Sequence, residues 1–343
     1  LKELLDQGKI QIICLVRNGD KKRLEDVLSW YFGAGWTAGI RSRIRVAAGD
    51  LSLPCLGMEE REWKALADEV DGIYHSAADV RHYAADAGEF MNTNVTGTET
   101  MIALSLQADA VLHYISTASI SGDFLKDEPE KQMVFTEDDF YIGQNWEDNI
   151  YIRSKFLAEA CIYKAMEEKG LNARVYRLGR ITGRCTDHVF QRNPESNAAY
   201  LMMRAVRALG AITESMSLLP VDLTPVDWCA AAVIALGGSD RTALHLLNPQ
   251  PPSMKEVAQV LVPDLVIVPD ESYGMLLQER MNEENRDILA PLLDYYNRTG
   301  IGESRIQVDC SKTLETFKKE GFGWEIPPAA RLIEGFSGLF TYC

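Results

Sequence analysis

The chain has 343 residues, a hydrophobic content of 46% and a formal net charge of −15 at pH 7. This length allows a large core and two lobes, whereas the acidic charge argues against nucleic acid or an acidic membrane as the main partner. No apolar run is long enough for a membrane span, and the start LKELLDQGK lacks a signal peptide's apolar stretch. The seven cysteines and five histidines are scattered, so we expect reduced thiols, no bound metal and a cytoplasmic location.

Strand and helix patterns alternate in the first half of the chain. Short apolar runs predict buried strands over residues 10–16, 44–48, 70–77, 111–116 and 173–178. The stretches between them predict helices over residues 21–30, 59–69 and 89–106, and a long helix that ends at Lys169. This alternation predicts an α/β fold with a doubly wound parallel, Rossmann-like sheet, covered on both faces and binding ligands at the carboxyl ends of its strands.

The pattern becomes mostly helical after about residue 184. The predicted helices cover residues 198–209, 227–236, 254–261, 273–282, 284–297, 311–320 and 329–336. We therefore expect a Rossmann domain over residues 1–185 and a smaller, mostly helical substrate lobe over residues 186–343. Short apolar segments within residues 218–248 are expected to cross back partly to the sheet.

The helix that ends at Lys169 carries the clearest boundary signals. Asp148 and Asn149 are cap-type residues, and Gly170 follows a cation in the last turn. The residues expected to face a core, by their helical spacing, are Ile152, Phe156, Tyr163 and Met166.

Tyr151 and Lys155 lie four residues apart on this helix, so a phenol and an ammonium share one face. A nearby cation favours the phenolate, so we expect a lowered pKa for Tyr151, which would suit proton transfer. The pair alone is weak evidence, because a surface lysine one turn from a core tyrosine gives the same spacing. His75 and His113 lie in apolar runs and are expected to be packed core histidines.

The first strand is followed by Arg17, at the position where an NAD enzyme usually carries a carboxylate for the ribose 2′-hydroxyl. An arginine can pair with a 2′-phosphate instead, so Arg17, with Lys21 or Lys22, favours NADP. The alternative is an ordinary arginine at a strand exit.

Two other strand ends carry residues that suit a dinucleotide. Asp50 can accept from the adenine amino group, with the Leu51 backbone beside it, although a Gly-Asp turn can be a turn only. The small residues Ser76, Ala77 and Ala78 would let a cofactor approach the backbone, although tight packing would select the same residues.

Thr117 ends the strand over residues 111–116 and can donate to a developing oxyanion across from Tyr151. A threonine that caps the following turn is the alternative. Asn94 lies within a predicted helix and can hold a water or the local backbone.

Together these features resemble the extended short-chain dehydrogenases/reductases, and within them the thioester reductase domains of nonribosomal peptide synthetases and carboxylic acid reductases. The discriminating stretch is residues 135–159, FTEDDFYIGQNWEDNIYIRSKFLAE, with support from residues 177–184, 223–236 and 321–328. The resemblance implies Thr117, Tyr151 and Lys155 as the catalytic triad and NADPH as the hydride source, with the cofactor also held near Leu178 and Gly179.

Two departures from this family stand out. Arg180 lies where asparagine is expected, so the role of that loop is open. The family's first strand and its Gly-x-x-Gly-x-x-Gly turn would precede Leu1, so we expect a fragment of a longer protein that binds NADPH poorly by itself.

The resemblance implies reductive release of an acyl or peptidyl thioester from a phosphopantetheinyl carrier domain, with upstream synthetase modules in the same polypeptide. The product would be an aldehyde or, after a second reduction, an alcohol. Two alternatives stay open: a nucleotide-sugar epimerase or dehydratase on the same scaffold, and a non-catalytic NADP-sensing protein.

Overall fold

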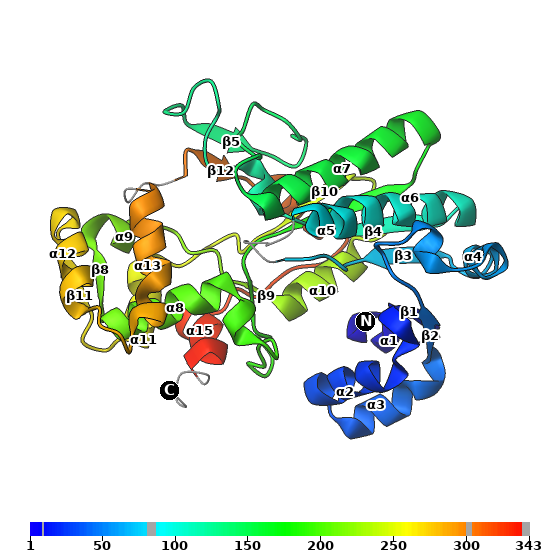
Figure 1. Cartoon of the computed structure of the whole chain (residues 1–343), viewed down its shortest axis with the longest axis horizontal. Helices are drawn as coiled ribbons and strands as arrows, with labels where there is room; N and C mark the ends of the chain where they lie inside the picture. The colour runs from blue at the N-terminus through cyan, green and yellow to red at the C-terminus, as the bar shows by residue number, and fades with distance from the viewer. Residues whose placement is uncertain (9, 81–86, 300–303, 338–343) are drawn as a thin grey trace. The chain divides into compact units, whose positions relative to one another are not determined.

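Parallel strands and the helices between them dominate the first part of the structure, a computed structural model that describes residues 1–8, 10–80, 87–299 and 304–337 (Figure 1). Its main sheet has four strands in the order β10-β6-β4-β3, namely Ala243–Leu246, Ala173–Leu178, Val111–Thr117 and Gly72–His75. β3 and β4 are parallel, with Gly72 opposite Val111. The predicted fold class is confirmed.

Helices α6 (Gly97–Ala108) and α7 (Ile150–Lys169) pack side by side in this part of the chain (Figure 1). The core shared by the sheet and these helices includes the fully buried side chains of Leu112, Ile162 and Val175. α4 (Glu60–Ala67) contributes Trp63 and Leu66 to the same core. The apolar runs seen in the sequence therefore form the interior that positions α7.

The strands β1 (Ile12–Val16) and β2 (Ile44–Ala48) form a separate parallel pair. They lie with three helices, α1 (Lys2–Asp6), α2 (Lys21–Phe32) and α3 (Ala34–Ile40) (Figure 1). The small core of this piece is made by Leu5, Leu28 and Ile40. Among the described strands, β1 pairs with β2 alone and β3 with β4 alone, so the parallel strands of this unit form two pieces.

The helix predicted over residues 89–106 is divided into three parts. α5 (Ala87–Met91) leads into a π-helical turn, Asn92–Thr96, and α6 follows it. A π turn inserts one extra residue per turn, and such turns are frequent at functional sites. Here the turn contains Asn94, which is buried.

The chain forms two compact units whose limits differ from the expected division. The first comprises residues 1–122, 144–177 and 233–244, and the second comprises residues 123–143, 178–232 and 245–343. Residues 233–244 belong to the first unit because β10 extends the main sheet beside β6. Residues 123–143 belong to the second unit because β5 (Met133–Phe135) pairs with β12 (Ile306–Val308).

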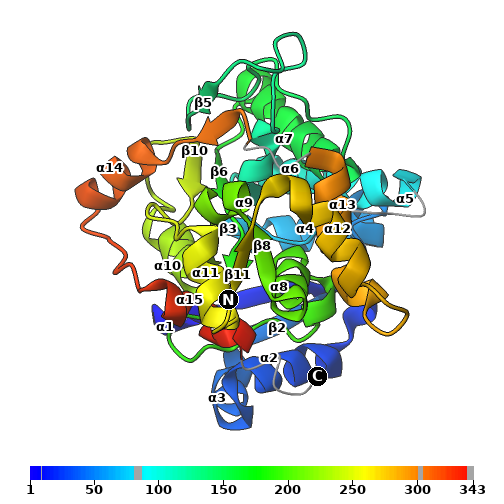
Figure 2. The same ribbon diagram turned by 90° about the vertical axis from the view of Figure 1, so that its left-hand side faces the viewer.

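The second unit is mostly helical, as the sequence predicts. Its helices are α8 (Ala198–Leu209), α9 (Glu214–Leu218), α10 (Val226–Ala235, whose end enters the first unit), α11 (Met254–Leu261), α12 (Asp270–Arg280), α13 (Arg286–Thr299), α14 (Ser311–Lys319) and α15 (Ala329–Ser337). α8 packs against α13 (Figure 2), and Met203, Val257 and Leu289 are fully buried in the core.

Short parallel strand pairs complete the second unit. β8 (Ala211–Thr213) pairs with β11 (Val266–Val268), and β7 (Ile181–Thr182) pairs with β9 (Thr224–Pro225). These strands and α3 were not predicted, because segments of two or three residues carry no readable alternation. None of the described helices has the length and apolarity needed to cross a membrane.

Candidate active site

Helix α7 presents Tyr151 and Lys155 from its first two turns. The Asn149 side chain caps the helix by accepting from the backbone N–H groups of Tyr151 (2.9 Å) and Ile152 (3.2 Å). The helix ends at Gly170, whose φ of 70° is the left-handed conformation that glycine adopts easily. Both predicted caps are present, so the backbone that carries the two side chains is fixed at its start and its end.

The buried face of α7 differs from the expected one. Phe156 is buried, as predicted, whereas Ile152, Tyr163 and Met166 are only half-buried. The side chains of Lys155 and Glu159 take part in the buried face instead. A helix that buries charged side chains needs polar partners on the elements packed against it.

Thr117 is the last residue of β4, and its side chain is 7% exposed. Its hydroxyl makes a side-chain hydrogen bond with the Tyr151 hydroxyl. The same Oγ1 accepts from the backbone N–H of Ser119 at 3.2 Å. Thr117 therefore caps the following turn and also meets Tyr151, so both roles considered from the sequence are present.

The Lys155 side chain is 4% exposed and lies against β4. Its Nζ donates to the backbone carbonyl of Ile115 at 2.9 Å and lies 4.9 Å from the centre of the Tyr114 ring. Burial lowers the pKa of Lys155 to about 8, and the Glu159 carboxylate opposes this change. The ammonium is thus fixed two residues before Thr117 on the same strand.

The pKa of Tyr151 moves in the opposite direction to the sequence expectation. Burial raises the pKa of Tyr151 above its ordinary value, although the hydrogen bond with Thr117 lowers it in part. The expected lowering by Lys155 was wrong because the desolvation of the phenolate outweighs it. The phenol is therefore neutral at physiological pH, which is the form that can donate a proton.

Asn94 ties the loop after β3 to α7. Its Oδ1 accepts from the backbone N–H of Asp79 at 2.7 Å, and its Nδ2 donates to the Asp79 carbonyl at 2.8 Å. Nδ2 also donates to Ser154 Oγ at 2.9 Å, and Ser154 Oγ donates to the Tyr151 carbonyl at 2.8 Å. Asn94 thus holds local backbone, as one of the two predicted roles requires. Ser154 was missed, because a serine between Tyr151 and Lys155 carries no pattern of its own.

The loop that Asn94 holds contains the small residues predicted to approach a cofactor. Ser76 and Ala77 are exposed, and Ala78 is half-buried. Their backbone is accessible, and the Asn94 bonds fix its course at Asp79. This arrangement fits a cofactor that lies against the loop.

Both predicted core histidines are buried. His75 Nε2 lies 3.1 Å from Thr98 Oγ1, and His113 Nδ1 lies 2.9 Å from the Tyr176 hydroxyl. Burial lowers the pKa of His75 to about 3 and that of His113 to about 4. Both are therefore neutral at physiological pH and serve as packed hydrogen-bonding groups.

The ends of β1 and β2 bring Arg17 and Asp50 together. Arg17 Nε lies 3.0 Å from Asp50 Oδ2, and the side chains are 59% and 25% exposed. Ser52 donates to Asp50 from its backbone N–H (2.9 Å) and its hydroxyl (2.7 Å), and these bonds hold the pKa of Asp50 below its usual value. The sequence placed these two residues at separate strand ends, and their direct contact was not foreseen.

Close backbone packing surrounds the turn after β2. A Cβ on Gly49 would lie 2.6 Å from Leu15 Cδ1, and a Cβ on Gly97 would lie 3.2 Å from Leu51 Cβ. Both positions thus select glycine by space. The exposed guanidinium of Arg17 and the lysines at the start of α2, Lys21 and Lys22, form a cationic edge that fits a phosphorylated ribose.

Leu178 and Gly179 belong to the second unit, where β6 ends. Gly179 N donates to the Leu246 carbonyl at 3.0 Å, and a Cβ on Gly179 would lie 1.9 Å from Asp222 Oδ2. Asp222 also accepts from Arg180 N at 2.7 Å, and burial raises the pKa of Asp222. The Arg180 backbone is thus fixed by a carboxylate. Asp222 was missed, although a lone carboxylate in an apolar stretch is a usable signal.

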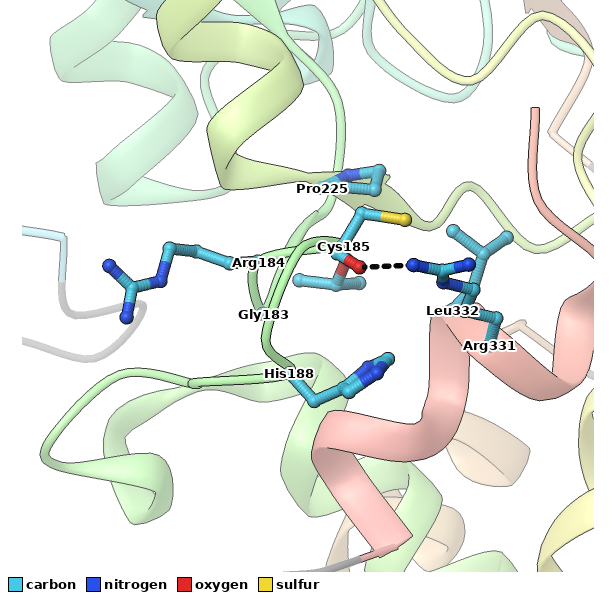
Figure 3. Close-up of a pocket in the computed structure, with 8 residues that line it drawn as sticks. Gly183, Arg184, Cys185, His188, Pro225, Arg331 and Leu332 are labelled. Carbon is cyan, nitrogen blue, oxygen red and sulfur yellow. Dashed lines mark hydrogen bonds between the residues drawn. The ribbon is translucent and has the colours of Figure 1, made fainter. Parts of the chain in front are cut away.

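A small hollow of about 190 Å³ lies elsewhere, within the second unit (Figure 3). Arg331 Nη2 donates to the Cys185 carbonyl at 3.4 Å there, and Arg184 turns outward to pair with Asp187. None of the predicted site residues lines this hollow. The six cysteines that the structure describes are unpaired, whereas Cys343 lies outside the described residues, and no group of metal ligands is found in the described part of the chain.

Comparison with known proteins gives a family match. A family model described as "Male sterility protein", an NAD-binding family, matches residues 1–233. Among solved structures, a thiolation-reductase di-domain from an archaeal nonribosomal peptide synthetase matches with 26% identity and a TM-score of 0.84. The match covers 99% of this chain and 72% of that chain.

Two curated relatives point in the same direction. The linear gramicidin synthase of Brevibacillus parabrevis contains a polypeptide that is 29% identical over 257 residues, which are 73% of this chain and 5% of that polypeptide. The carboxylic acid reductase of Segniliparus rugosus is 29% identical over 266 residues, 70% of this chain and 22% of that protein. The chain thus spans a small part of these relatives. Nucleotide-sugar epimerases match with 13% identity, which shows the shared fold alone. The predicted resemblance to extended short-chain reductases of the terminal reductase type is confirmed.

Proposed function

The chain belongs to the male sterility protein family, and from this premise we propose that it is an NADPH-dependent reductase of carrier-bound acyl or peptidyl thioesters. The observation that carries the proposal is the meeting of Thr117 and Tyr151 through a hydrogen bond, with Lys155 anchored on the same strand at Ile115. A neutral phenol and a hydroxyl on one oxygen are what a carbonyl reduction requires.

NADPH would be held by residues that fit it in this structure. Those of the first unit are Arg17, Asp50, Leu51, Ser76, Ala77, Ala78, Asn94, Tyr151 and Lys155, and those of the second are Leu178 and Gly179. The exposed Arg17 supports NADPH over NADH, since a guanidinium pairs with a 2′-phosphate. When bound, the cofactor supplies a hydride for the thioester carbonyl carbon.

The side chains of the first unit perform the proton chemistry. Thr117 donates to the carbonyl oxygen as negative charge develops there, and the Tyr151 hydroxyl transfers its proton to the same oxygen. The raised pKa of Tyr151 keeps this proton available until the oxygen becomes basic. The buried Lys155 ammonium stabilises the phenolate that remains. Collapse of the resulting hemithioacetal gives an aldehyde and a free thiol, and a second reduction would give an alcohol.

The partner is proposed to be a phosphopantetheinyl carrier domain, within a polypeptide that also carries upstream synthetase modules. The thiolation-reductase di-domain and the synthetase among the relatives support this assignment. The cytoplasm is the proposed location, because acyl carriers and NADPH are both present there.

The test uses the protein at its full natural length. NADPH oxidation is followed with an acyl-pantetheine thioester and, separately, with a UDP-sugar, and aldehyde formation is measured directly. We expect reduction of the thioester alone. Turnover of the UDP-sugar instead would favour an epimerase or dehydratase, and no turnover of either would favour a non-catalytic NADP-binding protein.

The role of Tyr151 is tested in the same assay. We expect Tyr151→Phe to lower kcat about a hundredfold or more, because general acid catalysis contributes at least that much. Tyr31→Phe on α2 removes the same atom from a residue outside the proposed site and is the matched control. Retention of more than about a tenth of kcat by Tyr151→Phe would exclude its acid role.

A further inference from the structure

A fully buried ion pair lies one helical turn beyond Lys155. Arg177 Nη2 is 2.9 Å from Glu159 Oε2, Arg177 Nε is 3.1 Å from the same oxygen, and both side chains are 0% exposed. Ser116 Oγ donates to the other carboxylate oxygen, Oε1. The Glu159 carboxylate is thus held from two sides, by a guanidinium on β6 and by a hydroxyl on β4.

The position of this carboxylate follows from the helix repeat. Tyr151, Lys155 and Glu159 recur every four residues along α7, on the side that lies against β4 (Figure 1). β4 supplies the partners in register: the Ile115 carbonyl holds Lys155, the Ser116 hydroxyl holds Glu159, and Thr117 meets Tyr151. Three consecutive strand residues thus hold three successive helix turns.

The groups that face Lys155 contain one negative charge. The Tyr114 ring lies 4.9 Å from its Nζ, and burial raises the pKa of Tyr114, so its phenol is neutral. His75 interacts with Lys155 but is also neutral at physiological pH, since burial lowers its pKa to about 3. Tyr151 is neutral because burial raises its pKa, so Glu159 is the counter-charge of Lys155 within this set.

We infer that Glu159 is a positioning residue, fixed by Arg177 and Ser116, that keeps the buried Lys155 in its protonated form. Lys155 acts through its charge, so its role in the proposed reductase, on which this inference rests, depends on a group that contacts neither substrate nor cofactor. A buried ammonium without a counter-charge loses its proton readily, because desolvation penalises the charged form. Glu159 thereby extends the pH range over which the site works.

The rival explanation is that Glu159 and Arg177 only hold β6 to α7. Removing one member of a buried pair destabilises the fold, whereas replacing both with neutral residues often does not. A structural role should therefore be restored in the double variant Glu159→Gln/Arg177→Met. A charge-holding role should stay lost in that variant, because the anion is still absent.

The direct measurement is the titration midpoint of Lys155 itself. Lysine labelled with ¹³C at the ε carbon is introduced, and the Lys155 signal is assigned by its loss in Lys155→Arg. We expect Glu159→Gln and the double variant each to lower the midpoint by about one pH unit or more. Tyr163→Phe, which removes a hydroxyl 3.2 Å from Arg177 Nη2 and no charge, is the control and should keep the midpoint.

The kinetic measurement is the basic limb of the pH profile of kcat/KM, which we expect to move downward by the same interval. A double variant with the wild-type midpoint, or one that does not fold, overturns the inference, since the pair would then serve the fold alone. The NMR titration needs no substrate, so an absence of thioester reduction in the wild type would contradict the proposed function and leave this result interpretable.

Discussion

The first unit contains two arginine–carboxylate pairs in opposite surroundings. Glu159–Arg177 has both side chains 0% exposed, whereas Arg17–Asp50, at the ends of β1 and β2, has side chains 59% and 25% exposed. The buried pair has additional fixed partners in Ser116 and Tyr163. The exposed pair is held on the carboxylate side by Ser52.

The difference shows how one unit can separate fixed geometry from exchangeable binding. Breaking a buried pair leaves an uncompensated charge, so its partners stay in one arrangement. An exposed pair is worth little to stability, because water solvates both groups well. Arg17 can therefore turn to a phosphate at small cost, whereas Glu159 keeps its place beside Lys155.

The largest expected effect comes from breaking the buried pair from its cationic side. We expect Arg177→Met to lower the free energy of unfolding by about 3–5 kcal/mol, because the Glu159 carboxylate remains buried without a cation. Chemical unfolding followed by circular dichroism measures this change. A loss below about 1 kcal/mol, the range of an exposed pair, would remove the contrast.

Buried neutral histidines extend the contrast to pH. His113 has its pKa lowered to about 4 in the fold, so the unfolded chain binds more protons between about pH 6.5 and 4. Its contribution to stability is complete above pH 6.5 and is lost as the pH falls towards 4. We expect the double variant His113→Phe/Tyr176→Phe, which keeps the ring packing, to reduce the acid slope of the unfolding free energy by up to about 1.4 kcal/mol per pH unit. An unchanged slope would show that His113 is not buried in its neutral form.

The exposed pair should affect binding and leave stability nearly unchanged. We expect Arg17→Gln to change the unfolding free energy by less than about 1 kcal/mol. The same variant should weaken NADPH binding about tenfold or more and leave NADH binding unchanged, because a charge-assisted bond to the 2′-phosphate is lost. Calorimetry with both cofactors on the full-length protein measures this, and equal weakening of both would refute the role of Arg17.

The sequence predicted the elements whose signals are local. β2, β6, α8 and α11 have the predicted bounds, and α7 has its predicted caps at Asn149 and Gly170. In each case the apolar period and the terminating residue lie within the element itself. The π turn Asn92–Thr96 was missed, because an inserted residue leaves the helical period nearly unchanged.

The site was predictable to the level of residues but not of their interactions. Thr117, Tyr151 and Lys155 carry a readable spacing, whereas the Glu159–Arg177 pair joins a helix to a strand and depends on the fold. Two signals were available: a carboxylate four residues after Lys155, and an arginine inside an apolar strand. The direction of the Tyr151 pKa was not predictable, since it is set by burial more than by the neighbouring amine.

The central claim is that Thr117 and Tyr151 act on one oxygen. Its most direct test is kcat for thioester reduction by Thr117→Val, Tyr151→Phe and the double variant, all in the full-length protein. Residues that act as a unit are strongly non-additive, so we predict that the double variant is barely slower than Tyr151→Phe alone. A double variant slowed by the full product of the two single effects would mean that the two hydroxyls act independently, and would contradict the account.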